Sequence, residues 1–334
     1  MTDASGSRAS GSRASGSRAS GWWAQRSGLA GTVAVVTGGA GGLGSAIACD
    51  LAANGVRVAV IDIDAEAAAE VSSSLASLTS SLPSSLPGGE ALVQVGDARD
   101  PDALARLFRA VDSTWGRVDT LVNVVGGTFR APFLDTTPKG WDALLRMNLH
   151  HVLHSCSLAA RRMQAGGRGG SIINITTIEA HRAAPGFAVY AAAKAAVEQF
   201  GRTLAVELAP DGIRVNNVAP DYVPTPNLAR ISGGDLGDGG MASPAGQRAA
   251  IPMGRAGQVT DVSGCVVFLA SALSSYLTGT TLHPDGGTYA SSGWFNWPGS
   301  GWANHVPGRF LQDLAPEVPP DLAPEVLRDS DHGH

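Results

Sequence analysis

The feature that most constrains the fold of this chain is an alternation of short apolar runs with longer stretches of helical spacing. Seven runs rich in valine and isoleucine are predicted as strands: 33–36, 56–61, 91–95, 120–124, 171–175, 213–218 and 280–282. Their nearly continuous apolar character is typical of parallel strands buried on both faces of a sheet. Helical spacing extends over 43–53, 101–114, 141–163, 190–208 and 261–270. This alternation predicts an α/β fold: a doubly wound, seven-stranded parallel sheet with right-handed crossovers.

The two ends of the chain differ in composition from this central region. Residues 4–18 are three copies of Ala-Ser-Gly-Ser-Arg. Small polar residues bury too little apolar area to offset chain entropy, so residues 1–27 are predicted as a disordered repeat tail. A transit peptide is the rival interpretation, because the segment contains Arg and Ser, but it lacks an apolar helical face. Residues 28–290 are predicted as a single domain, and the proline-rich residues 291–334 as an extended C-terminal tail. Within the domain, the Ser- and Pro-rich residues 72–89 are predicted as a loop insertion.

Composition narrows the classes of partner. The chain has 334 residues, 44% of them apolar, and a formal net charge of −5. Nucleic acids and anionic membranes attract strongly basic surfaces, so neither is predicted as a partner. Three widely spaced cysteines without a C-x-x-C motif favour reduced thiols and a cytoplasmic location. His150 and His154 are four residues apart but have no third ligand nearby, so packing or interface roles are predicted and no metal site.

A glycine-rich segment separates the first predicted strand from the first helix. Residues 37–44 read Thr-Gly-Gly-Ala-Gly-Gly-Leu-Gly. Gly38, Gly42 and Gly44 permit a tight turn, a close approach of backbone to a pyrophosphate and close packing of the helix on the strand. The helix that begins near Leu43 offers free N–H groups and the positive end of its dipole to phosphates. A glycine-rich turn without a ligand is the alternative, but the position between strand and helix favours the dinucleotide site of a Rossmann-type fold.

Two aspartates follow the next two predicted strands. Asp62, eighteen residues after Gly44, closes the second strand. A carboxylate there accepts hydrogen bonds from the adenosine ribose and repels a 2′-phosphate, and no Arg or Lys follows closely. We therefore predict NAD rather than NADP as the cofactor, with Asp64 as a solvated helix cap. Asp97, after the third strand, is predicted to bond the adenine amino group; the alternative is that it caps the helix beginning at Pro101.

A tyrosine and a lysine stand four residues apart in one predicted helix. The chain contains only two lysines and four tyrosines, yet Tyr190 and Lys194 have the i, i+4 spacing that places side chains on one helix face. A cation beside a phenol lowers its pKa from the reference value of about 10, which makes Tyr190 a usable proton donor and acceptor. A buried tyrosine beside a surface lysine is the purely structural alternative.

Together the Thr-Gly-x-x-x-Gly-x-Gly run, the Tyr-x-x-x-Lys pair and their separation resemble the short-chain dehydrogenase/reductase family. The resemblance extends from about residue 29 to residue 287. It implies hydride transfer between a nicotinamide and an alcohol or carbonyl carbon, with Tyr190 as acid/base and Lys194 holding the nicotinamide ribose. The family's Asn-Asn-Ala-Gly appears here as Asn-Val-Val-Gly, in which Asn123 is expected to support the sheet beside the adenosine ribose.

The resemblance also implies further site residues. Asn148 matches the asparagine that holds a water in a proton relay; an interior residue that bends a helix is the alternative. Thr177 stands where the family has a serine that orients the carbonyl, and Thr176 is the alternative hydroxyl. Val223 and Thr225 match the loop that binds the nicotinamide carboxamide. Thr177 and Asp221 are departures from the family pattern; Asp221 replaces a glycine and either lines the substrate mouth or caps the next segment. Residues 226–255, rich in Gly and Pro, are predicted as a mobile lid over the substrate.

These observations predict an NAD-dependent oxidoreductase that interconverts a small-molecule secondary alcohol, such as a hydroxysteroid or a similar apolar alcohol, and its ketone. The alternative is an NADPH-dependent 3-oxoacyl thioester reductase of the same fold, and a non-catalytic nucleotide-binding scaffold is less favoured. The resemblance implies a homo-oligomer, a dimer or a tetramer. The side chains expected to flank the substrate pocket are Glu179, His181, Phe187 and Tyr222.

Overall fold

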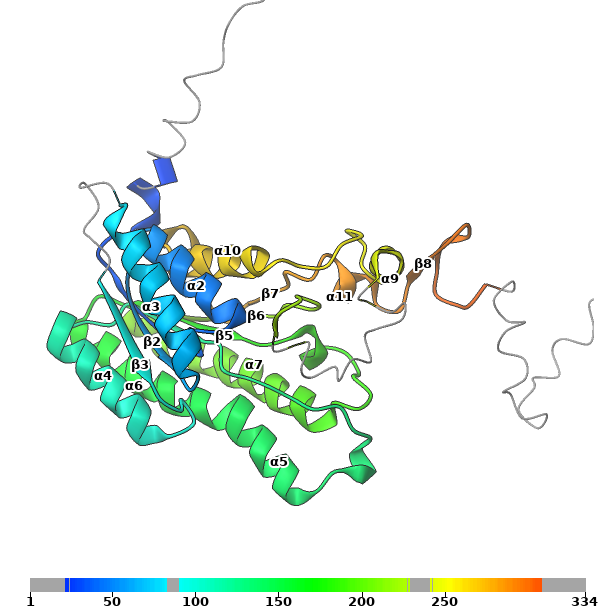
Figure 1. Cartoon of the computed structure of the whole chain (residues 1–334), viewed down its shortest axis with the longest axis horizontal. Helices are drawn as coiled ribbons and strands as arrows, with labels where there is room; N and C mark the ends of the chain where they lie inside the picture. Colours follow the sequence, from blue (N-terminus) through cyan, green and yellow to red (C-terminus); the bar gives the residue numbers. More distant parts are fainter. Residues whose placement is uncertain are drawn as a thin grey trace, which may run out of the picture.

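A seven-stranded parallel sheet runs through the part of the chain that the computed structural model describes, residues 22–23, 25–82, 90–226, 228, 241 and 243–307. The strand order is β3-β2-β1-β4-β5-β6-β7 (Figure 1). The strands are β1 (Val33–Thr37), β2 (Arg57–Asp62), β3 (Ala91–Val95), β4 (Thr120–Asn123), β5 (Gly170–Ile175), β6 (Ile213–Val218) and β7 (Thr281–Leu282). The order reverses direction at β1, and the sheet confirms the predicted doubly wound α/β fold.

Strand β1 shows why both faces of the sheet are covered. Its side chains alternate between two hydrophobic clusters, with Val33 and Val35 in one and Ala34 and Val36 in the other, and all four are fully buried. Successive residues of a strand point to opposite faces, so a continuous apolar run needs a helical layer on each side.

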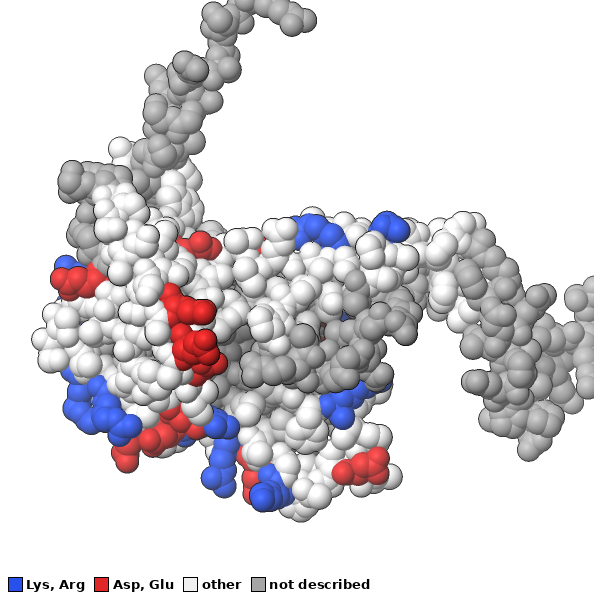
Figure 2. Space-filling model, viewed as in Figure 1, with Lys and Arg blue, Asp and Glu red and all other residues white. Residues whose placement is uncertain are grey.

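The two helical layers follow from this requirement (Figure 1). One layer contains α2 (Gly42–Ala53), α3 (Ala65–Ser80) and α10 (Val259–Ala270), which share a core with Ala34 and Val36. The other contains α4 (Pro101–Trp115), α6 (His151–Gly166) and α7 (Ala188–Leu208). Figure 2 shows that charged side chains on the viewed face lie in separate groups of either sign.

The predicted loop over residues 72–89 is wrong in its first half. Helix α3 continues to Ser80, and Val71 and Leu75, four residues apart, are buried in the core beneath it. Apolar residues at helical spacing outweigh the weak helix propensity of the surrounding serines. Residues 83–89 lie outside the described residues.

The predicted helix over residues 141–163 consists of three pieces. Helix α5 (Pro138–Leu145) continues into a turn of π-helix, η2 (Arg146–His150), and then into α6. A π-helical turn widens the helix by one residue and is frequent at functional sites. The predicted helix over residues 190–208 is α7, which begins two residues earlier.

The described ends of the chain are more ordered than predicted. Residues 22, 23 and 25–27 are helical, and the Trp23 indole donates a 2.8 Å hydrogen bond to Asn54 at the end of α2. An entirely disordered tail up to residue 27 is therefore wrong at its end, while residues 1–21 lie outside the described residues. At the other end, β8 (Phe295–Trp297) and β9 (Gly301–Ala303) form an antiparallel hairpin that projects from the body (Figure 1). This hairpin replaces an extended tail over the described part of 291–334.

Shorter elements connect the layers: η1 (Phe133–Asp135), η3 (Ile178–Ala180), η4 (Ala209–Asp211), α9 (Pro244–Ala250), η5 (Ala272–Ser274) and α11 (Thr288–Ser291). Helix α9 lies within the segment predicted as a lid, of which residues 227, 229–240 and 242 lie outside the described residues. None of the described helices is both long and apolar enough to span a membrane.

Candidate active site

The glycine turn between β1 and α2 has the conformation that its sequence predicts. Gly38 and Gly42 have φ angles of +65° and +43°, which residues with a Cβ rarely adopt. A Cβ on Gly44 would lie 1.9 Å from the Gly38 carbonyl oxygen, so only glycine fits where α2 begins. Leu43 packs against the core in the first turn of α2. The first backbone N–H groups of a helix lack helical acceptors, so this helix N-terminus is where a phosphate would be expected to bind.

Asp62 lies at the carboxyl end of β2, beside this turn. Its Oδ2 accepts a 3.0 Å hydrogen bond from the Ala40 backbone N–H, and its Oδ1 accepts one of 3.1 Å from Asp64 N–H. The carboxylate is therefore fixed against the glycine turn, where a dinucleotide ribose would lie. Asp64 caps α3 by accepting from the N–H groups of Glu66 and Ala67, as predicted.

Asp97 makes an ion pair with Arg99 that was not predicted from the sequence. Both of its carboxylate oxygens bond the Arg99 guanidinium, at 2.8–3.0 Å, and Arg99 holds the pKa of the Asp97 carboxyl below its usual value. Asp100, rather than Asp97, caps α4. The alternative role of Asp97 as a cap is therefore wrong, and any contact with adenine would come from a carboxylate already paired with arginine.

Asn123 points into the sheet. Its side chain donates to Asn174 Oδ1 at 2.9 Å and accepts from Ser155 Oγ at 2.6 Å. The chain of amides continues from Asn174 to Asn217 at 3.1 Å. Asn123 is only 2% exposed, so its side chain joins neighbouring strands and supports the sheet, and a contact of its backbone with the cofactor stays a prediction.

Tyr190, Lys194 and Thr177 come together at the carboxyl end of the sheet. Tyr190 and Lys194 occupy successive turns of α7, and the Thr177 hydroxyl lies near enough to the Tyr190 phenol to lower its pKa. The Lys194 ammonium is buried and donates a 2.9 Å hydrogen bond to the Ile175 carbonyl. The alternative hydroxyl, that of Thr176, instead donates to Glu198 at 2.7 Å. The geometry therefore favours Thr177 as the hydroxyl that faces the phenol.

The pKa values of Tyr190 and Lys194 differ from those expected from the sequence, where Lys194 was expected to lower the pKa of the Tyr190 phenol. Burial raises the pKa of Tyr190 to about 12, although the Thr177 hydroxyl lowers it. Burial also lowers the pKa of Lys194 to about 8, and the Glu198 carboxylate counteracts that effect. Near neutral pH the phenol is thus a proton donor and the ammonium remains mostly protonated.

Asn148 lies in the π-helical turn η2 and clamps the loop after β4. Its Nδ2 donates to Gly127 O at 2.8 Å and its Oδ1 accepts from Gly127 N–H at 3.2 Å. A Cβ on Gly126 would lie 2.9 Å from Lys194 Nζ and 3.1 Å from Asn148 Oδ1. Because Gly126 has no side chain, the side chains of Asn148 and Lys194 both pack against its backbone. Asn148 is buried in a helix irregularity, as the structural alternative predicts, and its role in a proton relay stays a prediction.

The segment after β6 returns to the glycine turn. Val223 is buried, and Thr225 packs against Gly42, where a Cβ would approach the Thr225 side chain to 3.2 Å. These residues are 183 positions apart in the sequence (225 minus 42) but adjacent at the N-terminus of α2. Thr225 therefore lies beside the glycine turn, and binding of the nicotinamide carboxamide by Val223 and Thr225 stays a prediction.

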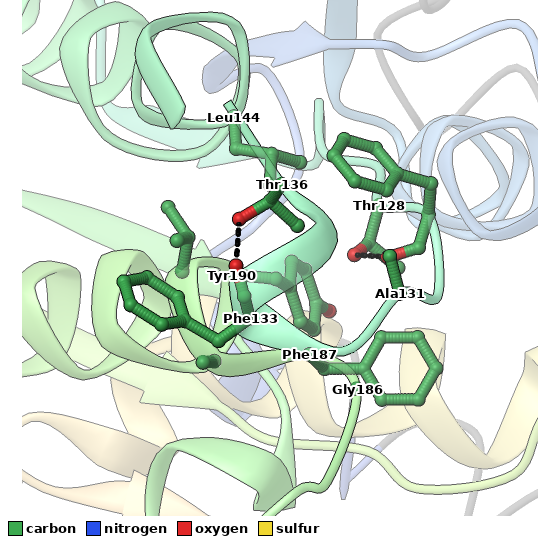
Figure 3. A pocket seen from close by; sticks show the side chains of 11 residues that line it. Thr128, Ala131, Phe133, Thr136, Leu144, Gly186, Phe187 and Tyr190 are labelled. Atoms are coloured by element: carbon green, nitrogen blue, oxygen red, sulfur yellow. Dashed lines mark hydrogen bonds between the residues drawn. The ribbon is translucent and has the colours of Figure 1, made fainter. Parts of the chain in front are cut away.

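A small apolar pocket, with a cavity volume of about 10 Å³, lies beside Tyr190 (Figure 3). Its aromatic lining consists of Phe187, before α7, together with Phe129 and Phe133 from the segment between β4 and α5. Thr136 Oγ1 donates to the Phe133 carbonyl at 2.6 Å and fixes the turn that presents this ring. The sequence reading identified Phe187 but missed Phe129 and Phe133, although an aromatic pair between a strand and a helix was visible.

Polar groups lie on the other side of Tyr190. Glu179 pairs with Arg182 at 2.8 Å, and Arg182 Nη2 lies 3.6 Å from Asp221 Oδ1. Burial raises the pKa of the Asp221 carboxyl. Asp221 therefore faces a cation from the β5–α7 segment, whereas His181 turns away from the pocket toward Glu198. His150 and His154 are exposed, and the described residues contain no group of three potential metal ligands.

Comparison with known proteins identifies the family. A family model described as enoyl-(acyl carrier protein) reductase matches residues 38–289. A 3-oxoacyl-[acyl-carrier-protein] reductase of Synechocystis is 34% identical over 78% of this chain and 97% of its own length. Cyclohexanol dehydrogenase of Rhodococcus is 34% identical over 78% of this chain and 98% of its own length.

A solved structure resembles the chain over a similar extent. The crystal structure of carveol dehydrogenase from Mycobacterium avium in complex with NAD has a TM-score of 0.71 and 30% sequence identity, and it covers 79% of this chain and 99% of its own. The family binds nicotinamide cofactors and acts on small molecules, and its members are commonly oligomeric. On these matches, the chain belongs to the short-chain dehydrogenase/reductase family and is an oxidoreductase acting on CH–OH groups.

Proposed function

We propose that this protein is an NAD-dependent dehydrogenase that interconverts an apolar secondary alcohol and its ketone. The observation that carries the proposal is the position of Tyr190 between the Thr177 hydroxyl and a pocket lined by Phe129, Phe133 and Phe187. Aromatic walls bind an apolar substrate, while the two hydroxyl groups hold its single oxygen. The relatives named for cyclohexanol and carveol act on cyclic secondary alcohols, which supports this substrate class.

The cofactor assignment depends on the carboxylate at the glycine turn. Asp62 is fixed by Ala40 N–H at the end of β2, where it would accept hydrogen bonds from a ribose diol and repel a 2′-phosphate. The residues proposed to bind the cofactor are Gly38, Gly42, Leu43, Gly44, Asp62, Asp97, Asn123, Tyr190, Lys194, Val223 and Thr225. Bound NAD would supply the hydride acceptor and, in its oxidised form, a positive charge close to the phenol.

Proton transfer, orientation of the substrate and binding of the ribose are assigned to four residues of this chain. With its pKa raised by burial, Tyr190 is protonated near neutral pH and donates its proton to the carbonyl oxygen during reduction. During oxidation it first releases this proton to solvent, and the resulting phenolate then accepts the hydroxyl proton of the alcohol. Thr177 orients the substrate oxygen, as a hydroxyl that donates and accepts. Lys194, held by the Ile175 carbonyl, binds the nicotinamide ribose and supplies positive charge. Asn148 holds the loop of Gly127 next to Lys194 and continues the path for protons.

A substrate panel tests this proposal. Cyclic and open-chain secondary alcohols are oxidised with NAD or NADP, and a 3-oxoacyl thioester is reduced with NADH or NADPH, all followed by nicotinamide absorbance. We expect turnover of cyclic alcohols with NAD. Preferred reduction of the thioester with NADPH would replace this proposal by the function of the Synechocystis relative. The absence of turnover, despite cofactor binding, would favour a nucleotide-binding scaffold.

A further inference from the structure

A buried glutamate one turn beyond Lys194 connects the parts of the candidate site. Tyr190, Lys194 and Glu198 occupy successive turns of one face of α7, and Glu198 is only 1% exposed. Burying a carboxylate is costly unless it is paired and hydrogen-bonded, so its partners indicate what it stabilises.

The partners of Glu198 bracket the segment that carries Thr177. Its Oε1 accepts from Thr176 Oγ1 at 2.7 Å, and its carboxylate oxygens lie 2.9 and 3.0 Å from His181 Nε2. Thr176 immediately precedes Thr177, and His181 follows it after the turn η3. Both ends of the segment 176–181 are therefore attached to a single side chain of α7.

A second set of contacts fixes Glu198 itself. Thr281 Oγ1 of β7 donates to Oε2 at 3.4 Å, and the Arg202 guanidinium lies 3.5 Å from the same oxygen. The carboxylate thus joins β5, β7 and α7. A helix is rigid over two turns, so the distance between Thr177 and Tyr190 is determined in part by Glu198.

The charge of Glu198 acts on the neighbouring ammonium. Lys194 is buried, and the polar groups that face it are Tyr190 and Glu198 on its own helix, Asn148 in η2, the Ile175 carbonyl and His151 in α6. His151 is neutral near pH 7, because burial lowers its pKa to about 3. Glu198 is consequently the one anion among these described neighbours, and its own remaining charged or titratable partners are His181, His283 and Arg202.

We infer that Glu198 is a positioning residue of this active site: it holds the segment of Thr177 against Tyr190 and places an anion one helical turn from the Lys194 ammonium. This inference rests on the proposed function and adds to it a residue outside the Asn-Thr-Tyr-Lys set.

Two substitutions distinguish the positioning role of Glu198 from the effect of its negative charge. Glu198→Asp keeps the charge but shortens the reach toward Thr176 and His181, so kcat should fall roughly 10²-fold, the scale of a 1 Å misplacement, while the pH profile is retained. Glu198→Gln keeps the reach but removes the anion. The alkaline limb of kcat/KM, on which Lys194 loses its proton, should then move to lower pH by about one unit. Activity of the Gln variant should recover on lowering the pH, whereas that of the Asp variant should not.

The matched control is Glu70→Gln, which removes an exposed glutamate from α3 in the opposite helical layer and should change neither kcat nor the pH profile. Thermal unfolding of each variant shows whether it is folded. An unchanged pH profile in Glu198→Gln, or a normal kcat in Glu198→Asp, would overturn the inference while leaving the proposed function intact, since Tyr190→Phe tests that function separately.

Crystal structures of a third variant, Glu198→Ala, and of the control provide a readout that needs no substrate. We expect the Thr177 hydroxyl to leave the Tyr190 phenol in Glu198→Ala and to remain beside it in Glu70→Gln. A Thr177–Tyr190 contact that survives in Glu198→Ala would contradict the positioning role, whether or not the unmodified protein oxidises the alcohols tested.

Discussion

At the scale of single residues, the candidate site combines groups whose roles depend on burial. The phenol of Tyr190 and the ammonium of Lys194 are both shifted by desolvation, the first toward retaining its proton and the second toward losing it. Proton transfer between them and the substrate oxygen is therefore sensitive to the few charges nearby, above all Glu179 and Glu198. Perturbed pKa values in a pocket of this kind are typical of catalytic sites.

Asp62 provides the prediction at this scale. We expect NAD to be preferred over NADP in kcat/KM, and Asp62→Ala to reduce this preference, because the ribose diol loses its acceptor and a 2′-phosphate is no longer repelled. Asp64→Ala is the matched control, since it removes a carboxylate two residues away that caps α3. It should cost about 1 kcal/mol of stability and leave the preference unchanged. Better use of NADP by the unmodified protein would contradict the assignment.

At the scale of elements, the glycine turn depends on contact between backbones. Gly44→Ala should destabilise the protein by about 1–3 kcal/mol, as overpacking does, because the new Cβ would collide with the Gly38 carbonyl. Gly41→Ala is the control: no atom lies within 4 Å of the Cβ it would add, and its φ of −103° suits alanine. Its stability should change by less than about 0.5 kcal/mol. Equal thermal unfolding temperatures for the two variants would show that the turn is not tightly packed.

The helices and strands also show which parts of the fold and of the site can be predicted from the sequence. The sheet was predictable, because a strand buried on both faces needs a continuous apolar run, as in β1. The second half of helix α3 was not predicted, because its few buried residues are weak evidence against the turn propensity of the surrounding serines. Tyr190 and Lys194 were visible because their spacing is local. Glu198 was not, since its importance arises from Thr176, His181 and Thr281, which only the folded sheet brings to it.

At the scale of the whole molecule, the outer surface of α7 suggests how copies associate. Val206 is 76% exposed on this helix, in a shallow surface with Gln199, Arg202, Thr203 and Glu207. Family members are commonly oligomeric, and we predict an isologous interface through this surface, giving a dimer or a tetramer. A charge introduced at the centre of such an interface is left desolvated and unpaired, so Val206→Glu should weaken association.

Light scattering of the full chain measures this directly. The unmodified protein should have a mass of two or four times 34.0 kDa, and Val206→Glu should shift it toward the monomer. Ser74→Glu, on an exposed position of α3 in the opposite helical layer, should leave the mass unchanged. A monomer at micromolar concentration, or a Val206→Glu variant that remains oligomeric, would place the interface elsewhere or exclude it.

The central claim is that the Tyr190 hydroxyl transfers the proton while the other residues of the site suffice to hold the cofactor, and Tyr190→Phe tests it most directly. The substitution removes one hydroxyl and preserves the ring, so NAD affinity and thermal stability should persist. Turnover of the best secondary alcohol should fall by roughly 10²–10⁴-fold, the usual worth of general acid–base catalysis. Tyr276→Phe, at a fully exposed tyrosine, is the control and should retain full activity. The measurement is steady-state alcohol oxidation beside NAD titration: a large loss of kcat at unchanged NAD affinity is the predicted result, and near-normal turnover of Tyr190→Phe would contradict the account.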